Sequence, residues 1–126
     1  MINKEDANIL IVDDIEDNRY TLERRLKRDG YKNIFLAEGG KIALDMAVEN
    51  KFDLILLDLM MPDMSGLEVL KYLKGDPLQR SIPVIMVTAS DEVETAAECI
   101  INGADDFITK PFNGTLLKAR VGASLE

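Results

Sequence analysis

Five short apolar runs alternate along the chain with longer segments of mixed polarity. The runs are Ala7–Val12, Ile34–Ala37, Asp53–Leu57, Pro83–Val87 and Asp106–Ile108, and a polar residue follows each one directly. Short apolar runs bounded by polar residues are typical of buried strands. The third run is apolar throughout from Leu54 to Leu57, as expected of a central parallel strand that is covered on both faces.

The segments between these runs have the periodicity of helices. Helices are predicted at Asp17–Asp29, Lys41–Asn50, Leu67–Lys74, Asp91–Asn102 and Asn113–Leu125. In the first helix, Tyr20, Leu22 and Leu26 are expected to form the apolar face. The fourth helix is expected to turn five apolar residues inward: Val93, Ala96, Ala97, Ile100 and Ile101. Gly30 and Gly103 are expected to end these two helices.

A strand followed by a helix, repeated five times with short loops, predicts an α/β fold. We expect a single doubly wound five-stranded parallel sheet with five helices on its two faces. Right-handed crossovers favour the strand order 2-1-3-4-5, whose switch point lies between the first and third strands. No repeat, linker or low-complexity segment interrupts residues 1–126, so we expect one domain.

Four of the predicted strands end in polar side chains that suit one site. Asp13 and Asp14 follow the first strand, Asp58 the third, Thr88 the fourth and Lys110 the fifth. Each alone is more often a helix cap, a turn residue or a solvated charge. Because the carboxyl ends of parallel strands share one edge, we expect these five side chains to meet in one crevice.

Three neighbouring aspartates repel one another unless a cation lies among them. Oxygen ligands without histidine or cysteine favour a hard cation, Mg²⁺ before Ca²⁺. We therefore predict Asp13, Asp14 and Asp58 as metal ligands.

Composition excludes several functions. The chain of 126 residues contains no histidine, which removes histidine-based acid–base chemistry and nearly all zinc sites. The single cysteine cannot form an internal disulfide, and we expect a cytoplasmic protein. The net charge of −8 argues against direct binding of nucleic acid or an anionic membrane.

These side chains suit transfer of a phosphoryl group to a carboxylate. Asp58 can form an acyl phosphate, while Mg²⁺, the Lys110 ammonium and the Thr88 hydroxyl neutralise the phosphoryl oxygens. Because the chain has no histidine, the phosphoryl donor must come from outside.

This pattern resembles the receiver domain of two-component response regulators, and the resemblance covers essentially the whole chain. It rests on Asp13-Asp14, on Leu57-Asp58-Leu59-Met60-Met61-Pro62 with Gly66, on Thr88-Ala89 and on Lys110-Pro111-Phe112. The resemblance implies a flavodoxin-like signalling domain rather than an enzyme, phosphorylated on Asp58 by a histidine kinase or phosphotransfer protein. It also implies Mg²⁺ bound by Asp14, Asp58 and the backbone carbonyl of Met60, with Asp13 helping through water.

The family resemblance also assigns a switch and an output face. It implies that Thr88 moves toward the phosphoryl group and that Phe107 turns inward. Met60 and Ser90 occupy the positions that tune the phosphoryl lifetime. The segment Asp91–Asn102 and the last helix would form the face used for dimerisation or effector contact, although two solvated helix faces are equally compatible with the sequence.

Three other functions remain to be weighed. An aspartate-based phosphohydrolase would need an acid two residues after the nucleophile, where Met60 stands. A flavin- or nucleotide-binding protein would need a phosphate loop after the first strand, where Asp13 and Asp14 repel phosphate. The third alternative is a docking module of the same fold that works without phosphorylation.

The last helix, from Asn113 to Leu125, reaches the end of the chain in mid-pattern. A natural frayed terminus also explains this. The run from Leu116 to Glu126 resembles receivers that continue into a nucleotide cyclase or a cyclic-di-nucleotide enzyme. We therefore expect residues 1–126 to be a receiver domain excised from, or continuing into, a larger protein. A stand-alone receiver and fusion to a transcription factor stay open.

Overall fold

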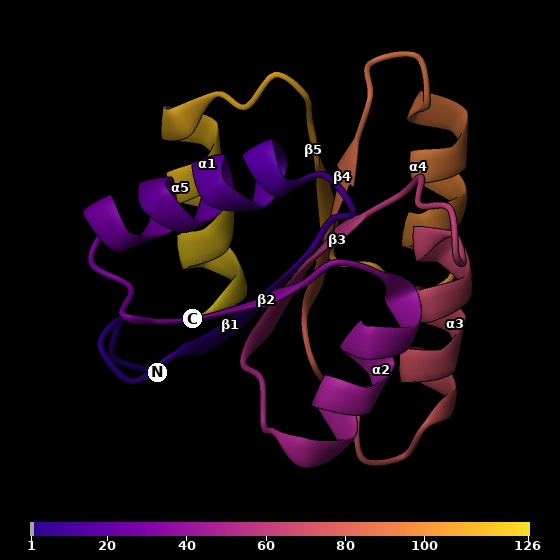
Figure 1. Cartoon of the computed structure of the whole chain (residues 1–126), viewed down its shortest axis with the longest axis horizontal. Coiled ribbons are helices and arrows are strands. Elements are labelled where there is room, and N and C mark those ends of the chain that lie inside the picture. The colour runs from indigo at the N-terminus through magenta and orange to yellow at the C-terminus, as the bar shows by residue number, and fades with distance from the viewer. Residues whose placement is uncertain (1) are drawn as a thin grey trace.

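Each predicted strand forms, and a helix follows each of them (Figure 1). The computed structural model describes residues 2–126. The elements are β1 Asn8–Val12, α1 Glu16–Arg28, β2 Asn33–Ala37, α2 Gly40–Glu49, β3 Leu54–Asp58, α3 Gly66–Gly75, β4 Val84–Thr88, α4 Val93–Ile101, β5 Asp106–Thr109 and α5 Gly114–Ser124.

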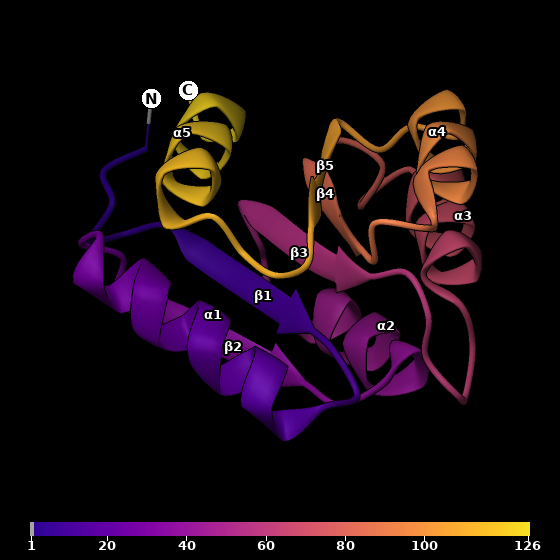
Figure 2. The same ribbon diagram turned by 90° about the horizontal axis from the view of Figure 1, so that it is seen from above.

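All paired strands are parallel, and their order is β2-β1-β3-β4-β5. The predicted order 2-1-3-4-5 is therefore confirmed, with the switch point between β1 and β3. Helices α1 and α5 cover one face of the sheet, and α2, α3 and α4 cover the other (Figures 1 and 2).

The period of two along a strand explains why both faces are apolar. In β1, Ile9 and Ile11 belong to the core beneath α1 and α5, whereas Leu10 and Val12 belong to the core beneath α2, α3 and α4. The five residues of β3 are all buried. A strand in the middle of such a sheet meets helices on both sides, so it needs apolar side chains at nearly every position.

The prediction of which α4 residues face the sheet is largely wrong. Ala96 is buried as expected, but Ile101 is 84% exposed, and Val93, Ala97 and Ile100 also face solvent. Cys99, which the prediction left out, is fully buried. One helix lying on a sheet buries only a narrow stripe, here Ala96 and Cys99, so the remaining apolar residues of α4 form an outer face.

Two of the three residues predicted for the inner face of α1, Leu22 and Leu26, are buried, but Tyr20 is exposed. The predicted helix ends are confirmed. Gly30 and Gly103 have φ of 104° and 110°, a backbone conformation that residues with a Cβ rarely adopt. Among residues 2–126, no helix has the length and apolar character needed to cross a membrane.

Candidate functional site

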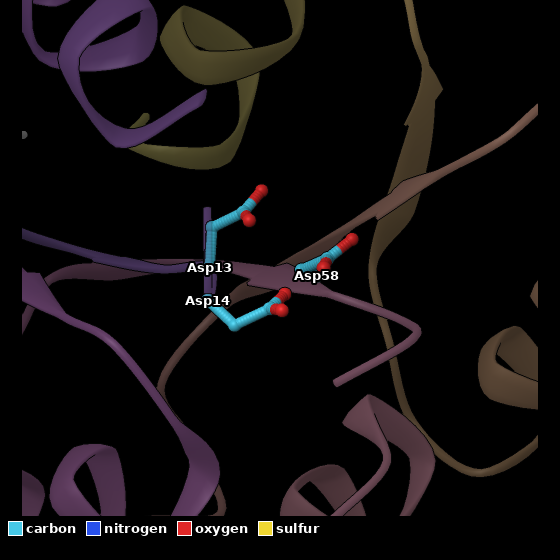
Figure 3. Close-up of side chains that lie close together, drawn as sticks. All are labelled: Asp13, Asp14 and Asp58. Carbon is cyan, nitrogen blue, oxygen red and sulfur yellow. The ribbon is translucent and has the colours of Figure 1, made fainter. Parts of the chain in front are cut away.

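Three aspartates converge at the carboxyl ends of β1 and β3. The register pairs Val12 with Leu57, so the next residues, Asp13 and Asp58, lie at the same edge of neighbouring strands. One carboxylate oxygen from each of Asp13, Asp14 and Asp58 lies within 4.8 Å of the other two. Figure 3 shows the three side chains gathered at this edge of the sheet. Asp13 and Asp58 are buried and Asp14 is half-buried. The predicted meeting of these three side chains is confirmed.

Lys110 brings a positive charge to this cluster. Its Nζ lies 3.1 Å from Asp58 Oδ1 and 3.5 Å from Asp13 Oδ2. The backbone holds it there, because the Lys110 amide donates to the Thr88 carbonyl at 2.8 Å, one step beyond the paired residues Thr88 and Thr109. The fifth strand thus delivers its lysine to the carboxylates that end the first and third strands.

One lysine does not balance three carboxylates. Burial raises the pKa of Asp58, the Asp13 charge raises it further, and the opposing effect of Lys110 still leaves it at about 6. Burial is the largest single influence on Lys110 and would lower its pKa, but its contacts with Asp58 and Asp13 together outweigh burial and raise it. The site is therefore an anionic, partly desolvated cluster that gains stability from added positive charge.

The turn between β1 and α1 fixes Asp13 in place. Asp13 Oδ1 accepts hydrogen bonds from the Ile15 amide at 2.9 Å and from Asn18 Nδ2 at 3.5 Å, and Arg19 Nη1 donates to the Asp13 carbonyl at 2.7 Å. The sequence prediction missed Asn18 and Arg19. They lie five and six residues after Asp13, in the first turn of α1, and a polar residue at that place next to the strand end is the signal that points to them.

These residues fit a hard divalent cation. Asp13 Oδ2 is buried and accepts no hydrogen bond within residues 2–126, so its one polar partner is the ion-paired Lys110 ammonium 3.5 Å away. Together with the carboxylates of Asp14 and Asp58, the Asp13 carboxylate provides the acidic oxygen ligands that Mg²⁺ prefers. Met60 follows Asp58 by two residues in the loop between β3 and α3, and its side chain is 63% exposed.

The other predicted residues lie around this cluster without joining it. Thr88 is fully buried at the end of β4, and its hydroxyl donates to the Ile108 carbonyl at 3.4 Å. Phe107 in β5 is half-buried against the core beneath α2, α3 and α4. Ser90 is exposed in the loop between β4 and α4.

Comparison with known proteins agrees with this geometry. The family model described as "Response regulator receiver domain" matches residues 9–122. The chain therefore belongs to the response regulator receiver domain family, a class of two-component signalling domains. Response regulator PleD of Caulobacter vibrioides is 45% identical over 115 residues, which are 91% of this chain and 25% of PleD.

Two further proteins, one similar in sequence and one in structure, resemble the chain. A probable cyclic di-GMP phosphodiesterase of Vibrio cholerae is 39% identical over 95% of this chain and 27% of its own length. The solved structure of Vibrio cholerae chemotaxis protein CheY4 has 31% identity and a TM-score of 0.87 over 94% of this chain and 98% of that one. The chain spans about a quarter of the length of PleD and of the phosphodiesterase. It spans about half of the length of CtrA of Caulobacter vibrioides, another relative.

Proposed function

We propose that Asp58 accepts a phosphoryl group from a histidine kinase or a phosphotransfer protein. The observation that supports this most directly is the contact of buried Asp58 with Lys110 inside a cluster of three carboxylates. A carboxylate with a pKa of about 6 is mostly ionised at neutral pH, which is the form that can attack phosphorus. Asp13, Asp14, Asp58 and the carbonyl of Met60 would hold Mg²⁺.

The transfer exchanges one bond for another. A carboxylate oxygen of Asp58 forms a bond to phosphorus, and the bond between phosphorus and the donor's imidazole nitrogen breaks. The nitrogen keeps the electron pair of that bond and takes a proton from solvent. Lys110 neutralises one phosphoryl oxygen. Bound Mg²⁺ supplies further charge stabilisation at the phosphoryl oxygens. Asp13 is held by hydrogen bonds from Ile15 and Arg19, so its carboxylate keeps its position beside Asp58 during the transfer.

Phosphorylation is proposed to act through Thr88 and Phe107. A phosphoryl group adds about −1.5 to −2 charges at Asp58 and offers new acceptor oxygens. The 3.4 Å bond from the Thr88 hydroxyl to Ile108 is long, so exchanging it for a phosphoryl oxygen costs little. Phe107 lies beside Ile108 in β5, and its half-buried ring can then fill the space nearer the core.

Met60 and Ser90 are proposed to set the lifetime of the phosphoryl group. The Met60 side chain offers no hydrogen bond to an attacking water, and Ser90 is short. We expect slow autodephosphorylation and a faster decay in Met60→Asn, measured as loss of labelled phosphate from purified protein. An unchanged or slower decay in the variant would contradict this role.

The output is proposed to lie in a further module, and the phosphodiesterase relative supports one that acts on cyclic di-nucleotides. The outer face of α4, with Val93, Ile100 and Ile101 exposed, supports contact with a second copy or an effector through α4 and α5.

Intact mass measured after incubation with Mg²⁺ and acetyl phosphate tests the acceptor. We expect wild type and Asp45→Ala, which lacks an exposed carboxylate on α2, to gain one phosphoryl group. Asp58→Ala should gain none, and neither should wild type with EDTA. No gain in wild type, together with no Mg²⁺ binding in a titration, would favour the docking module that works without phosphorylation.

A further inference from the structure

Helix α2 begins without a capping side chain of its own. Its N-cap residue is Gly39, and no side-chain hydrogen bond from that residue satisfies the first amides. Asp63, from the loop between β3 and α3, supplies the missing acceptors. The Gly40 amide donates to Asp63 Oδ1 at 3.3 Å, and the Lys41 amide donates to Asp63 Oδ2 at 3.1 Å. These amides also lower the pKa of Asp63, with Lys41 the larger cause.

The start of α2 is shaped to receive this loop. A Cβ on Gly39 would lie 2.9 Å from Asp63 Oδ2. A Cβ on Gly40 would overlap the side chain of Met64 and lie 2.7 Å from Val69 Cγ2. Two glycines in succession therefore allow the loop to pack against the helix end, where any larger residue would push it away.

The same loop contains Met60, whose carbonyl is a proposed metal ligand. The loop is closed at its base by the Gly66 amide, which donates to the Leu59 carbonyl at 2.7 Å. It ends in a capping box between Ser65 and Glu68 at the start of α3. Asp63 adds a third attachment, and it is the one that ties the middle of the loop to a different helix.

We propose that Asp63 is a positioning residue for the metal site, which it links to the start of α2. By capping α2 across the loop, Asp63 restrains the backbone that presents the Met60 carbonyl. This inference rests on the proposed function, because it assumes that Mg²⁺ binds at Asp13, Asp14 and Asp58. Linkage is reciprocal, so Mg²⁺ binding should in turn protect the Gly40 and Lys41 amides from exchange.

Three variants separate the cap from the charge. Asp63→Ala removes the cap, Asp63→Asn keeps a capping oxygen without the charge, and Asp45→Ala removes an exposed charge from α2 itself. Mg²⁺ affinity is measured by calorimetric titration, and protection of the Gly40 and Lys41 amides by hydrogen exchange with and without Mg²⁺. Thermal unfolding shows that each variant is folded.

We expect Asp63→Ala to bind Mg²⁺ about 3- to 10-fold more weakly, since losing a group that orients a ligand typically costs about tenfold or more. Asp45→Ala should stay within about twofold of wild type, and Asp63→Asn should lie between wild type and Asp63→Ala, because its amide keeps one of the two acceptor oxygens. In wild type, Mg²⁺ should slow exchange at Gly40 and Lys41, and Asp63→Ala should abolish that coupling.

Two outcomes would overturn the inference while leaving the proposed function intact. In the first, wild type binds Mg²⁺ and Asp63→Ala binds it equally well, which makes Asp63 a cap for α2 and nothing more. In the second, Asp45→Ala weakens Mg²⁺ binding as much as Asp63→Ala does, which assigns the effect to the loss of a nearby charge. Failure of wild type itself to bind Mg²⁺ would instead overturn the proposed function, and the inference with it.

Discussion

The loops that follow β3 and β4 are attached to the rest of the protein very differently. Residues 59–65 follow β3 and are held at their base by Gly66, in the middle by Asp63 and at their end by Ser65. Residues 89–92 follow β4, and two of their hydrogen bonds stay inside the loop. These join the Ala89 amide to Glu92 Oε1 at 2.7 Å and the Glu92 amide to the Ala89 carbonyl at 3.0 Å.

The helices that follow the loops differ in the same way. Helix α3 buries Gly66, Val69, Leu70 and Leu73, whereas α4 buries only Ala96 and Cys99. Local stability depends on buried apolar contacts and on hydrogen bonds between elements. The first loop is thus suited to hold the proposed metal ligand in place, and the second, next to Thr88, is suited to the movement proposed to follow phosphorylation of Asp58.

The largest expected effect comes from breaking the base of the first loop. In Gly66→Ala, the new Cβ would overlap the Asp58 carbonyl and lie 2.9 Å from Leu59 Cα. Because both neighbours are backbone atoms, we expect a loss of about 3 kcal/mol or more in the free energy of unfolding, measured by urea denaturation. Gly75→Ala is the control and should change stability little, because within residues 2–126 its added Cβ would meet no atom within 4 Å apart from its chain neighbours and the backbone of its own helix. Equal effects of the two substitutions would contradict the tight approach.

An intermediate effect is expected from removing the negative charge of Asp58. The pKa of Asp58 is about 6 in the folded protein, against an ordinary 3.8, so the folded state binds the extra proton and loses stability as the pH rises through this window. Metal-free Asp58→Asn should therefore be more stable than wild type at pH 7.5. We expect about 1–2 kcal/mol, less than the full shift implies because asparagine pairs poorly with Lys110.

The pH dependence distinguishes this cause from a general packing effect. At pH 4 the difference between Asp58→Asn and wild type should nearly vanish, because the carboxyl is then largely protonated in the folded state. Saturating Mg²⁺ should stabilise wild type and leave the variant nearly unchanged. A variant that is less stable than wild type at pH 7.5 would argue against repulsion in the site.

The smallest expected effect comes from loosening the second loop. Glu92→Ala removes the acceptor of the Ala89 amide, and we expect a stability loss of about 0.5–1 kcal/mol with faster exchange at that amide. Glu94→Ala, in the first turn of the same helix, controls for the lost charge. A loss as large as that of Gly66→Ala would show that the two loops are held equally firmly, and the contrast between them would fail.

The fold and most of the site were predictable because both depend on local patterns. Apolar runs that each end in a polar residue specify parallel strands, and parallel strands bring their carboxyl ends together. Asp13, Asp14, Asp58 and Lys110 therefore meet as the sequence predicts. The outer face of α4 was not predictable in this way. Its apolar residues exceed what one side of a helix can bury, and periodicity alone does not say which of them face the sheet.

The sequence by itself determined the strand order, the helix ends at Gly30 and Gly103, and the edge of the sheet where the acidic residues collect. Only the tertiary structure decided that Asp63 caps α2 by accepting from the Gly40 and Lys41 amides, which stand 23 and 22 residues earlier in the chain. It also decided that Arg19 donates to the Asp13 carbonyl. The physical reason is range. Strand and helix signals act between near neighbours, whereas a cap supplied across a loop exists only after packing has brought two distant segments together.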